Sequence, residues 1–174
     1  DFRSGTEIIE GLIKLVTQSQ RITHLIETEA IDIKERDGRY TVSLSNKTNK
    51  DVSAIILTCG FETFDAARQP EYGYRIYPNV ITAPEMELLL DNNGPTKGRL
   101  LRPSDGAPAH RIAIVFCVGS RNIKIGNSYC SRVCCSYSTK QAIEIMERDP
   151  EASVTCFYMD IRTYGRGFEE MYHH

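Results

Sequence analysis

The hydrophobic residues of the chain follow two different spacings, which predict a mixture of helices and strands. Over residues 5–18 they recur every three or four positions, the period of an amphipathic helix. Similar patterns predict helices at residues 84–90 and 136–148 and a short final helix at 167–172. Short apolar runs bounded by turn residues predict strands at residues 22–33, 40–44, 54–57, 111–118 and 154–159.

The order of these elements predicts an α/β fold with a β-rich N-terminal part. In the second half, strand 111–118, a helix and strand 154–159 follow one another, which is the βαβ unit of a parallel sheet, with strands buried on both faces. Residues 92–110 are rich in Gly, Pro, Asn and Asp and predict a connecting loop region. We therefore divide the sequence into 1–91, the loop region 92–110, and 111–174.

The composition and charge of the chain disfavour nucleic-acid-binding, membrane-spanning and secreted proteins. The chain has 174 residues, 41% hydrophobic and 25% charged, with a formal net charge of -2, as in an ordinary globular protein. Lys and Arg are interspersed with acids, which disfavours a nucleic-acid surface. The apolar runs are too short to cross a bilayer, and the first residues, DFRSGTEII, do not form a secretory signal, so we expect a cytoplasmic protein with no transmembrane segment.

Four of the six cysteines are clustered in the second half. Cys117, Cys130, Cys134 and Cys135 follow the spacing Cys-x12-Cys-x3-Cys-Cys. Thiolates are soft ligands that select zinc, copper(I) or iron-sulfur clusters. Adjacent cysteines suit the separated iron corners of a cubane better than a single tetrahedral zinc ion, so the spacing favours one 4Fe-4S cluster.

Two other interpretations of the cysteines remain open. The four thiols can hold a structural zinc ion in an interaction domain. Alternatively, Cys130 with Cys134 or Cys135 can form a thiol-disulfide redox site, although a Cys-x-x-Cys motif is absent. Cys59 and Cys156 lie outside the cluster, each at a predicted strand, and we expect both to be small core residues.

Several motifs in the same order carry a family resemblance. The stretch from about residue 72 to 172 resembles the thioredoxin-reductase-like core of the iron-sulfur flavoprotein family to which the A subunit of heterodisulfide reductase belongs. Residues 8–60 resemble, more loosely, the later part of a flavin-binding domain in that family. The motifs are RIYPNVIT, RPSDG, CVGSRN, YCSRVCC, TKQA and FYMDIRTYGRGFEEMY.

The resemblance implies a fold, cofactors and partners. It implies a fragment of an FAD/NAD(P)-binding-like fold, with a partial FAD-binding-like domain at 1–91 and a partial nucleotide-binding-like lobe at 111–174 that carries the cluster. The flavin fingerprint Gly-x-Gly-x-x-Gly is absent from the sequence, so FAD is expected in the parent protein. The implied function is that of an oxidoreductase module passing electrons between FAD and the cluster, with other subunits of the complex and electron-donor proteins as partners.

The resemblance also implies functional residues outside the cysteines. It implies that Ala30, Thr58 and Gly60 contribute to the adenosine side of the FAD site, with Gly60 at the end of a strand. It further implies that Lys140 and Glu87 form a polar pair beside the reactive edge of the isoalloxazine ring.

Overall fold

The chain forms two compact units in a computed structural model that describes residues 5–173. The first unit ends at Gly60 and the second begins at Phe61. The predicted loop region 92–110 therefore lies inside the second unit. Among the described residues, no helix has the length and apolar character needed to span a membrane.

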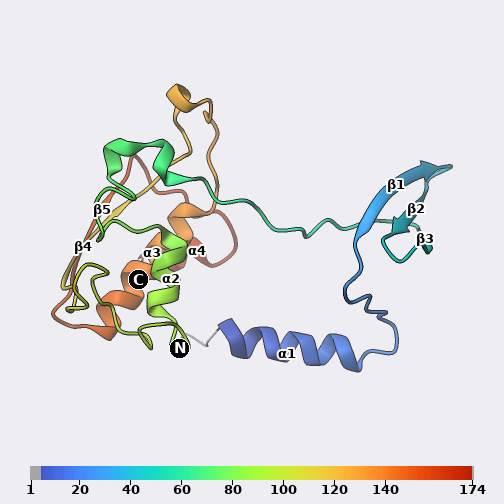
Figure 1. Cartoon of the computed structure of the whole chain (residues 1–174), viewed down its shortest axis with the longest axis horizontal. Helices are drawn as coiled ribbons and strands as arrows, with labels where there is room; N and C mark the ends of the chain where they lie inside the picture. Colours follow the sequence, from blue (N-terminus) through green and yellow to red (C-terminus); the bar gives the residue numbers. More distant parts are fainter. Residues whose placement is uncertain (1–4, 174) are drawn as a thin grey trace. The chain divides into compact units, whose positions relative to one another are not determined.

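The first unit contains one helix and one antiparallel sheet. The helix α1 spans Gly5–Gln18, as the hydrophobic period predicted. The strands β1 (Ala30–Arg36), β2 (Arg39–Leu44) and β3 (Asn49–Val52) pair in the order β1-β2-β3 (Figure 1). Asp37 and Gly38 form the tight turn between β1 and β2, and both have positive φ values, 54° and 74°, as a two-residue hairpin loop favours.

Two strand predictions in this unit are wrong in position. The predicted strand 22–33 begins only at Ala30, because pairing with β2 starts there, opposite Leu44. The predicted strand 54–57 is not a strand, and Ile56 is 87% exposed. The polar segment Asn49–Val52 instead forms the third strand by pairing with residues 40–43 of β2. The hairpin pairing therefore decided which segment became the third strand, and the apolar character of residues 54–57 did not.

The second unit carries the predicted βαβ arrangement. It contains the short 3-10 helices η1 (Ala66–Arg68) and η2 (Pro70–Tyr72), followed by α2 (Ala83–Leu90). After α2 come β4 (Arg111–Val115), the 3-10 helix η3 (Ile123–Ile125), α3 (Cys134–Arg148), β5 (Ser153–Phe157) and α4 (Phe168–His173). Figure 1 shows β4 and β5 side by side; they pair in parallel from Arg111 opposite Ser153 to Val115 opposite Phe157.

Burial of the parallel strands differs from the prediction. Strands β4 and β5 each alternate exposed and half-buried residues, so neither is buried on both faces, because among residues 5–173 this sheet has only two strands. The core lies instead around α3, which packs against α2, β5 and α4. Leu90 of α2 and Ile145 of α3 are the largest fully buried side chains among the described residues.

Candidate functional site

A hairpin-like loop brings Cys130 back toward Cys117. Cys117 follows the end of β4 with a φ of 61°, and the backbone N-H of Ser120 donates to its carbonyl oxygen over 3.0 Å. The backbone N-H of Arg121 donates to the carbonyl oxygen of Tyr129 over 2.8 Å. A pair of backbone hydrogen bonds between residues 122 and 127 closes the loop further out. The twelve residues between the two cysteines thus fold back on themselves.

The other two cysteines begin α3 and are buried. Cys134 and Cys135 are its first two residues and are 5% and 3% exposed. They form a small core cluster with Phe116, against which Cys117 and Cys156 also pack. All four clustered cysteines are free thiols, so the fold gathers them without a disulfide among them.

The thiols influence one another's protonation. Burial would raise the pKa of Cys134, but hydrogen bonds from Ser131, the backbone N-H of Cys117 and the thiols of Cys117 and Cys135 outweigh it and lower that pKa. Burial and then the charge of Cys134 raise the pKa of Cys117. The pKa of Cys135 is also raised by burial, and the charges of Cys134 and Cys130 act in the same direction. Each of the four cysteines therefore shifts the pKa of at least one other.

The loop after Cys117 is held by residues from the start of the second unit. The backbone N-H of Gly119 donates to the buried side chain of Gln69 over 2.9 Å. The Phe64 ring fills the space beside Gly119, since a Cβ there would lie 2.2 Å from Cγ of that ring. Gly119 also has a φ of 83°, which an L residue adopts only with strain. The glycine is thus required both by the backbone conformation and by the close approach of Phe64.

Arg121 and the backbone of Arg162 lie beside two of the thiols, and both arginine side chains pair with Asp160. The Arg121 guanidinium is ion-paired with Asp160, and Arg162 Nε donates to Asp160 Oδ2 over 3.1 Å. Burial raises the pKa of Cys117, and the charge of Arg121 opposes this shift. The backbone N-H of Arg162 likewise lowers the pKa of Cys135 against the effect of burial. Cys117 therefore lies near a positive charge, and Cys135 near a backbone hydrogen-bond donor.

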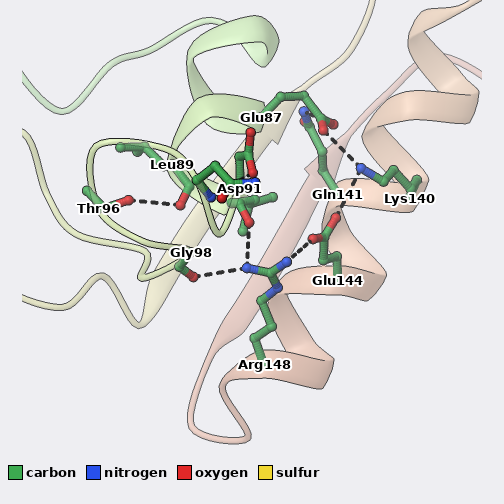
Figure 2. A network of polar contacts seen from close by, with 11 residues as sticks. Glu87, Leu89, Asp91, Thr96, Gly98, Lys140, Gln141, Glu144 and Arg148 are labelled. Carbon is green, nitrogen blue, oxygen red and sulfur yellow. Dashed lines mark hydrogen bonds and ion pairs between the residues drawn. The ribbon is translucent and has the colours of Figure 1, made fainter. Parts of the chain in front are cut away.

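Lys140 and Glu87 are in direct contact, although 53 residues separate them. Lys140 Nζ lies 2.9 Å from Glu87 Oε2 and 3.1 Å from Glu144 Oε2 (Figure 2). Burial would lower the pKa of Lys140, but hydrogen bonds with Glu87 and Glu144 outweigh it and raise that pKa. The lysine is therefore held as an ammonium between two carboxylates, with Glu87 on α2 and Glu144 on α3.

Two further side chains of α3 extend this contact to the backbone of α2. Gln141 Nε2 donates to the Ala83 carbonyl oxygen over 3.0 Å and to Glu87 Oε1 over 2.9 Å. Arg148 donates to the Leu90 carbonyl oxygen. It also donates to the Gly98 carbonyl oxygen and to Glu144 (Figure 2). These bonds hold both ends of α2 against one face of α3.

The residues predicted for the adenosine side of FAD all lie in the first unit. Ala30 is the first residue of β1, and it pairs with Leu44. Thr58 and Gly60 are exposed and lie in a segment without regular structure, so Gly60 does not end a strand as predicted. Gly60 has a φ of 75° with open space around it. Gly60 therefore serves to allow the positive φ of a turn at this position.

The two remaining cysteines differ from each other. Cys156 is half-buried in β5 and packs against the core cluster, as expected for a core residue. Cys59 is exposed, so its prediction as a core residue is wrong, because the strand expected to bury it does not form.

The donor set of the four clustered cysteines fits an iron-sulfur cluster chemically. They are free thiols gathered in one neighbourhood, with hydrogen-bond donors directed at three of them: Arg132 to Cys130, Cys117 to Cys134, and Arg162 to Cys135. Within residues 5–173, no group of three or more His, Cys, Asp or Glu side chains is arranged so that it could hold a single metal ion.

Sequence reasoning missed the charged residues around both groups. Arg121, Asp160 and Arg162 were overlooked because 39 residues separate Arg121 from Asp160. Glu144 and Arg148 could have been found, since they follow Lys140 at successive intervals of four residues, the spacing of neighbours on a helix.

Comparison with known proteins finds no matching family model but several relatives. The iron-sulfur A subunit of the CoB--CoM heterodisulfide reductase of Methanocaldococcus jannaschii is 48% identical over 121 residues, 70% of this chain and 18% of the relative. The A subunit of the H(2):CoB-CoM heterodisulfide,ferredoxin reductase of Methanothermobacter marburgensis is 48% identical over 122 residues, with the same shares. The A subunit of the ferredoxin:CoB-CoM heterodisulfide reductase of Methanosarcina mazei is 44% identical over 122 residues, 70% of this chain and 15% of the relative. The chain thus spans less than a fifth of the length of these relatives.

Proposed function

Because this chain is a homologue of a segment of the heterodisulfide reductase A subunit, we propose that it is an electron-transfer module of a flavoprotein of that type. In this proposal, Cys117, Cys130, Cys134 and Cys135 hold one 4Fe-4S cluster. The observation that carries it is the gathering of four free thiols by the loop after β4 and the first turn of α3. The relative from Methanocaldococcus jannaschii is named an iron-sulfur subunit, which supports the choice of cluster.

The chain's own residues are suited to hold such a group. A bound cubane would supply the capacity to accept and release one electron at a time. The cysteine thiolates would be its ligands, and burial of Cys134 and Cys135 would keep water from that side. The backbone N-H groups of Arg132 and Arg162 would hydrogen-bond to ligand sulfurs, which stabilises negative charge on them.

A flavin belongs to the same proposal, in the parent protein. Ala30, Thr58 and Gly60 would lie along its adenosine portion, on an FAD/NAD(P)-binding-like fold. Other subunits of a heterodisulfide-reductase-like complex and electron-donor proteins would be the partners, and the cytoplasm the location. The names of the relatives, which describe subunits of reductases, support this part of the proposal.

Lys140 and Glu87 would be the polar pair beside the flavin ring. The ammonium of Lys140 is shared between Glu87 and Glu144, so it is fixed in place and charged. A fixed cation near the ring favours anionic reduced flavin, and the carboxylate of Glu87 can hold the lysine or exchange a proton with it. Lys140→Met in the flavin-loaded parent protein should lower the reduction potential of the flavin. An unchanged potential in a redox titration would mean that Lys140 and Glu87 form only a structural ion pair.

Metal analysis of the full chain tests the cluster assignment. Protein purified and reconstituted without oxygen should contain iron and sulfide, and alanine at each of the four clustered cysteines should lower both. Cys156→Ala is the matched control, because Cys156 packs against the same core but is not a proposed ligand. Full iron content in both Cys117→Ala and Cys135→Ala would contradict the assignment.

The same measurement separates the two alternative functions. A structural zinc unit would be colourless and contain zinc without sulfide. A thiol-disulfide redox site is favoured by the contacts of Cys117 and Cys135 with Cys134, and it would contain neither metal nor sulfide. That protein would exchange disulfides, and Cys134→Ser would abolish the exchange.

A further inference from the structure

The Arg-Asp-Arg triad, formed by Arg121, Asp160 and Arg162, connects the two segments that surround the clustered cysteines. Arg121 belongs to the loop after β4, whereas Asp160 and Arg162 follow β5. Asp160 accepts from both guanidinium groups, with Arg162 Nη2 3.0 Å from its Oδ2. We propose that this triad is a positioning device that raises the reduction potential of the cluster, an inference that rests on the proposed function.

Arg121 is fixed on the loop that contains the proposed ligands. It lies four residues after Cys117, and its backbone N-H bonds to Tyr129, the residue before Cys130. Its side chain is only 19% exposed. A charge in such a partly buried position is screened less by water and salt than a surface charge. Its effect on the Cys117 thiol is therefore sustained at ordinary ionic strength.

Residues 160–162, which follow β5 closely, have alternating contacts. The Asp160 carboxylate faces Arg121, Ile161 packs against the core of Phe116, Cys134 and Cys135, and the backbone N-H of Arg162 hydrogen-bonds to Cys135. Hydrogen bonds from Arg121 and Arg162 hold the pKa of Asp160 below its usual range, so the carboxylate remains charged. The ion pairs thus fix the segment that directs an N-H at a ligand sulfur.

The charge balance of the triad predicts the sign of its effect. The positive charge of the triad that acts on a thiol is the Arg121 guanidinium, beside Cys117, and its partner Asp160 offsets part of that charge. A cubane held by four thiolates is an anion, and its one-electron reduction adds another negative charge. Positive charge and N-H donors stabilise the reduced form more than the oxidised form, so they raise the potential. Arg132, the other arginine nearby, has its guanidinium over the Tyr164 ring, 5.2 Å from the ring centre.

Two substitutions should shift the potential in opposite directions. Arg121→Met removes a positive charge and should lower the equilibrium constant for one-electron reduction roughly tenfold, about 59 mV for one electron. Asp160→Asn removes the negative charge while keeping a polar side chain, so it should raise the potential. The measurement is a reductive titration of the reconstituted full chain against redox mediators, followed by electron paramagnetic resonance, with iron and sulfide content determined for each variant.

Two controls separate charge from structure. Arg121→Lys keeps the charge and should restore most of the potential. Arg111→Met removes an exposed arginine at the start of β4, about 13 Å from the end of that strand at roughly 3.3 Å per residue, and should leave the potential unchanged. Shifts of the same sign in Arg121→Met and Asp160→Asn, or no shift in either, would overturn the inference. If the Arg121→Met protein lost its iron, Asp160→Asn alone would decide. A reduction potential that did not rise in that variant would also overturn the inference. Failure of the parent chain to bind iron and sulfide contradicts the proposed function instead.

Discussion

The contacts that stabilise the first unit internally differ in kind from those that stabilise the second. In the first unit, β1, β2 and β3 pair through their backbones, and Leu44 is the one buried residue among residues 5–60 that the structure describes. In the second unit, side chains bond to backbone groups far away in the sequence: Arg148 to the Leu90 carbonyl, Gln141 to the Ala83 carbonyl, and Gln69 to the Gly119 N-H. Pairing between strands that are close in sequence therefore builds the first unit, whereas the candidate site depends on contacts between residues far apart in sequence.

The largest expected effect is a core truncation in the second unit. Ile145→Ala should lower its free energy of unfolding by about 2–5 kcal/mol, because Ile145 is 2% exposed and its loss leaves a cavity. Leu12→Ala in α1 removes a side chain that is 56% exposed and should change stability by less than about 0.5 kcal/mol. Urea unfolding followed by tyrosine circular dichroism reports mainly the second unit, since Tyr40 is the one tyrosine of the nine before Gly60, and hydrogen exchange of α1 peptides reports the effect of Leu12→Ala. Equal losses in the two variants would contradict this contrast between the units.

Two glycines with positive φ give a closer comparison. Gly119→Ala should cost about 2–4 kcal/mol, because the new Cβ meets the Phe64 ring and the backbone is strained. Gly38→Ala, in the β1-β2 turn, has the same backbone strain but open space, so it should cost about 1–2 kcal/mol. Hydrogen exchange measured on peptides from each unit gives both values. Equal costs would mean that Phe64 can move aside.

A smaller loss is expected from the network between α2 and α3. Arg148→Met should destabilise the second unit by about 1–3 kcal/mol, because the Leu90 and Gly98 carbonyl oxygens and Glu144 lose their partner. The matched change in the first unit is Lys34→Met, which removes an ion pair with Asp32 between two exposed side chains and should cost less than about 1 kcal/mol. Urea unfolding measures the first change and hydrogen exchange of β1 peptides the second. A loss as large for Lys34→Met would contradict the proposed difference.

The predictions from sequence succeeded where spacing along the chain decides the structure. The helix over residues 5–18 and the order strand, helix, strand in the second half were confirmed, since both follow from local hydrophobic period. The strand at 54–57 failed because strand formation requires a partner, and the hairpin geometry gave that place to Asn49–Val52. An apolar run alone cannot specify a sheet.

The candidate site was predictable only in part for the same reason. The cysteines and Lys140 were identified from residue type and from family resemblance, and the structure brings Lys140 into contact with Glu87. The bonds that fold the loop between Cys117 and Cys130 could not be predicted, because they join backbone groups through turns. The role of Asp160 likewise could not be predicted from the sequence, since its contact with Arg121 exists only once β4 and β5 are paired.

The smallest expected effect concerns the first turn of α2 and depends on pH. The Glu85 carboxylate accepts from the Thr82 N-H over 2.6 Å, from the Thr82 hydroxyl over 2.7 Å and from the Tyr74 hydroxyl over 3.1 Å. Burial would raise the pKa of Glu85, but these hydrogen bonds and the charge of Arg75 outweigh it, and the pKa is lowered from its ordinary value of 4.5. Glu85 therefore stabilises the folded form fully above that ordinary value, and the contribution is lost as the pH falls through the lower pKa of the folded form.

Glu85→Gln should accordingly cost about 1 kcal/mol at neutral pH, in the range of a helix-capping interaction, and less as the pH falls. The control is Glu35→Gln, because the exposed Glu35 side chain also accepts from a backbone N-H, that of Gly38 over 2.8 Å, in the first unit. That change should stay within about 0.5 kcal/mol, as surface substitutions usually do. Urea unfolding of Glu85→Gln at neutral pH and near pH 3, beside hydrogen exchange of the β1-β2 turn in Glu35→Gln, gives the comparison. A cost for Glu85→Gln that does not shrink on acidification would show that its carboxylate charge contributes nothing, and that shape and hydrogen bonding alone hold this turn of α2.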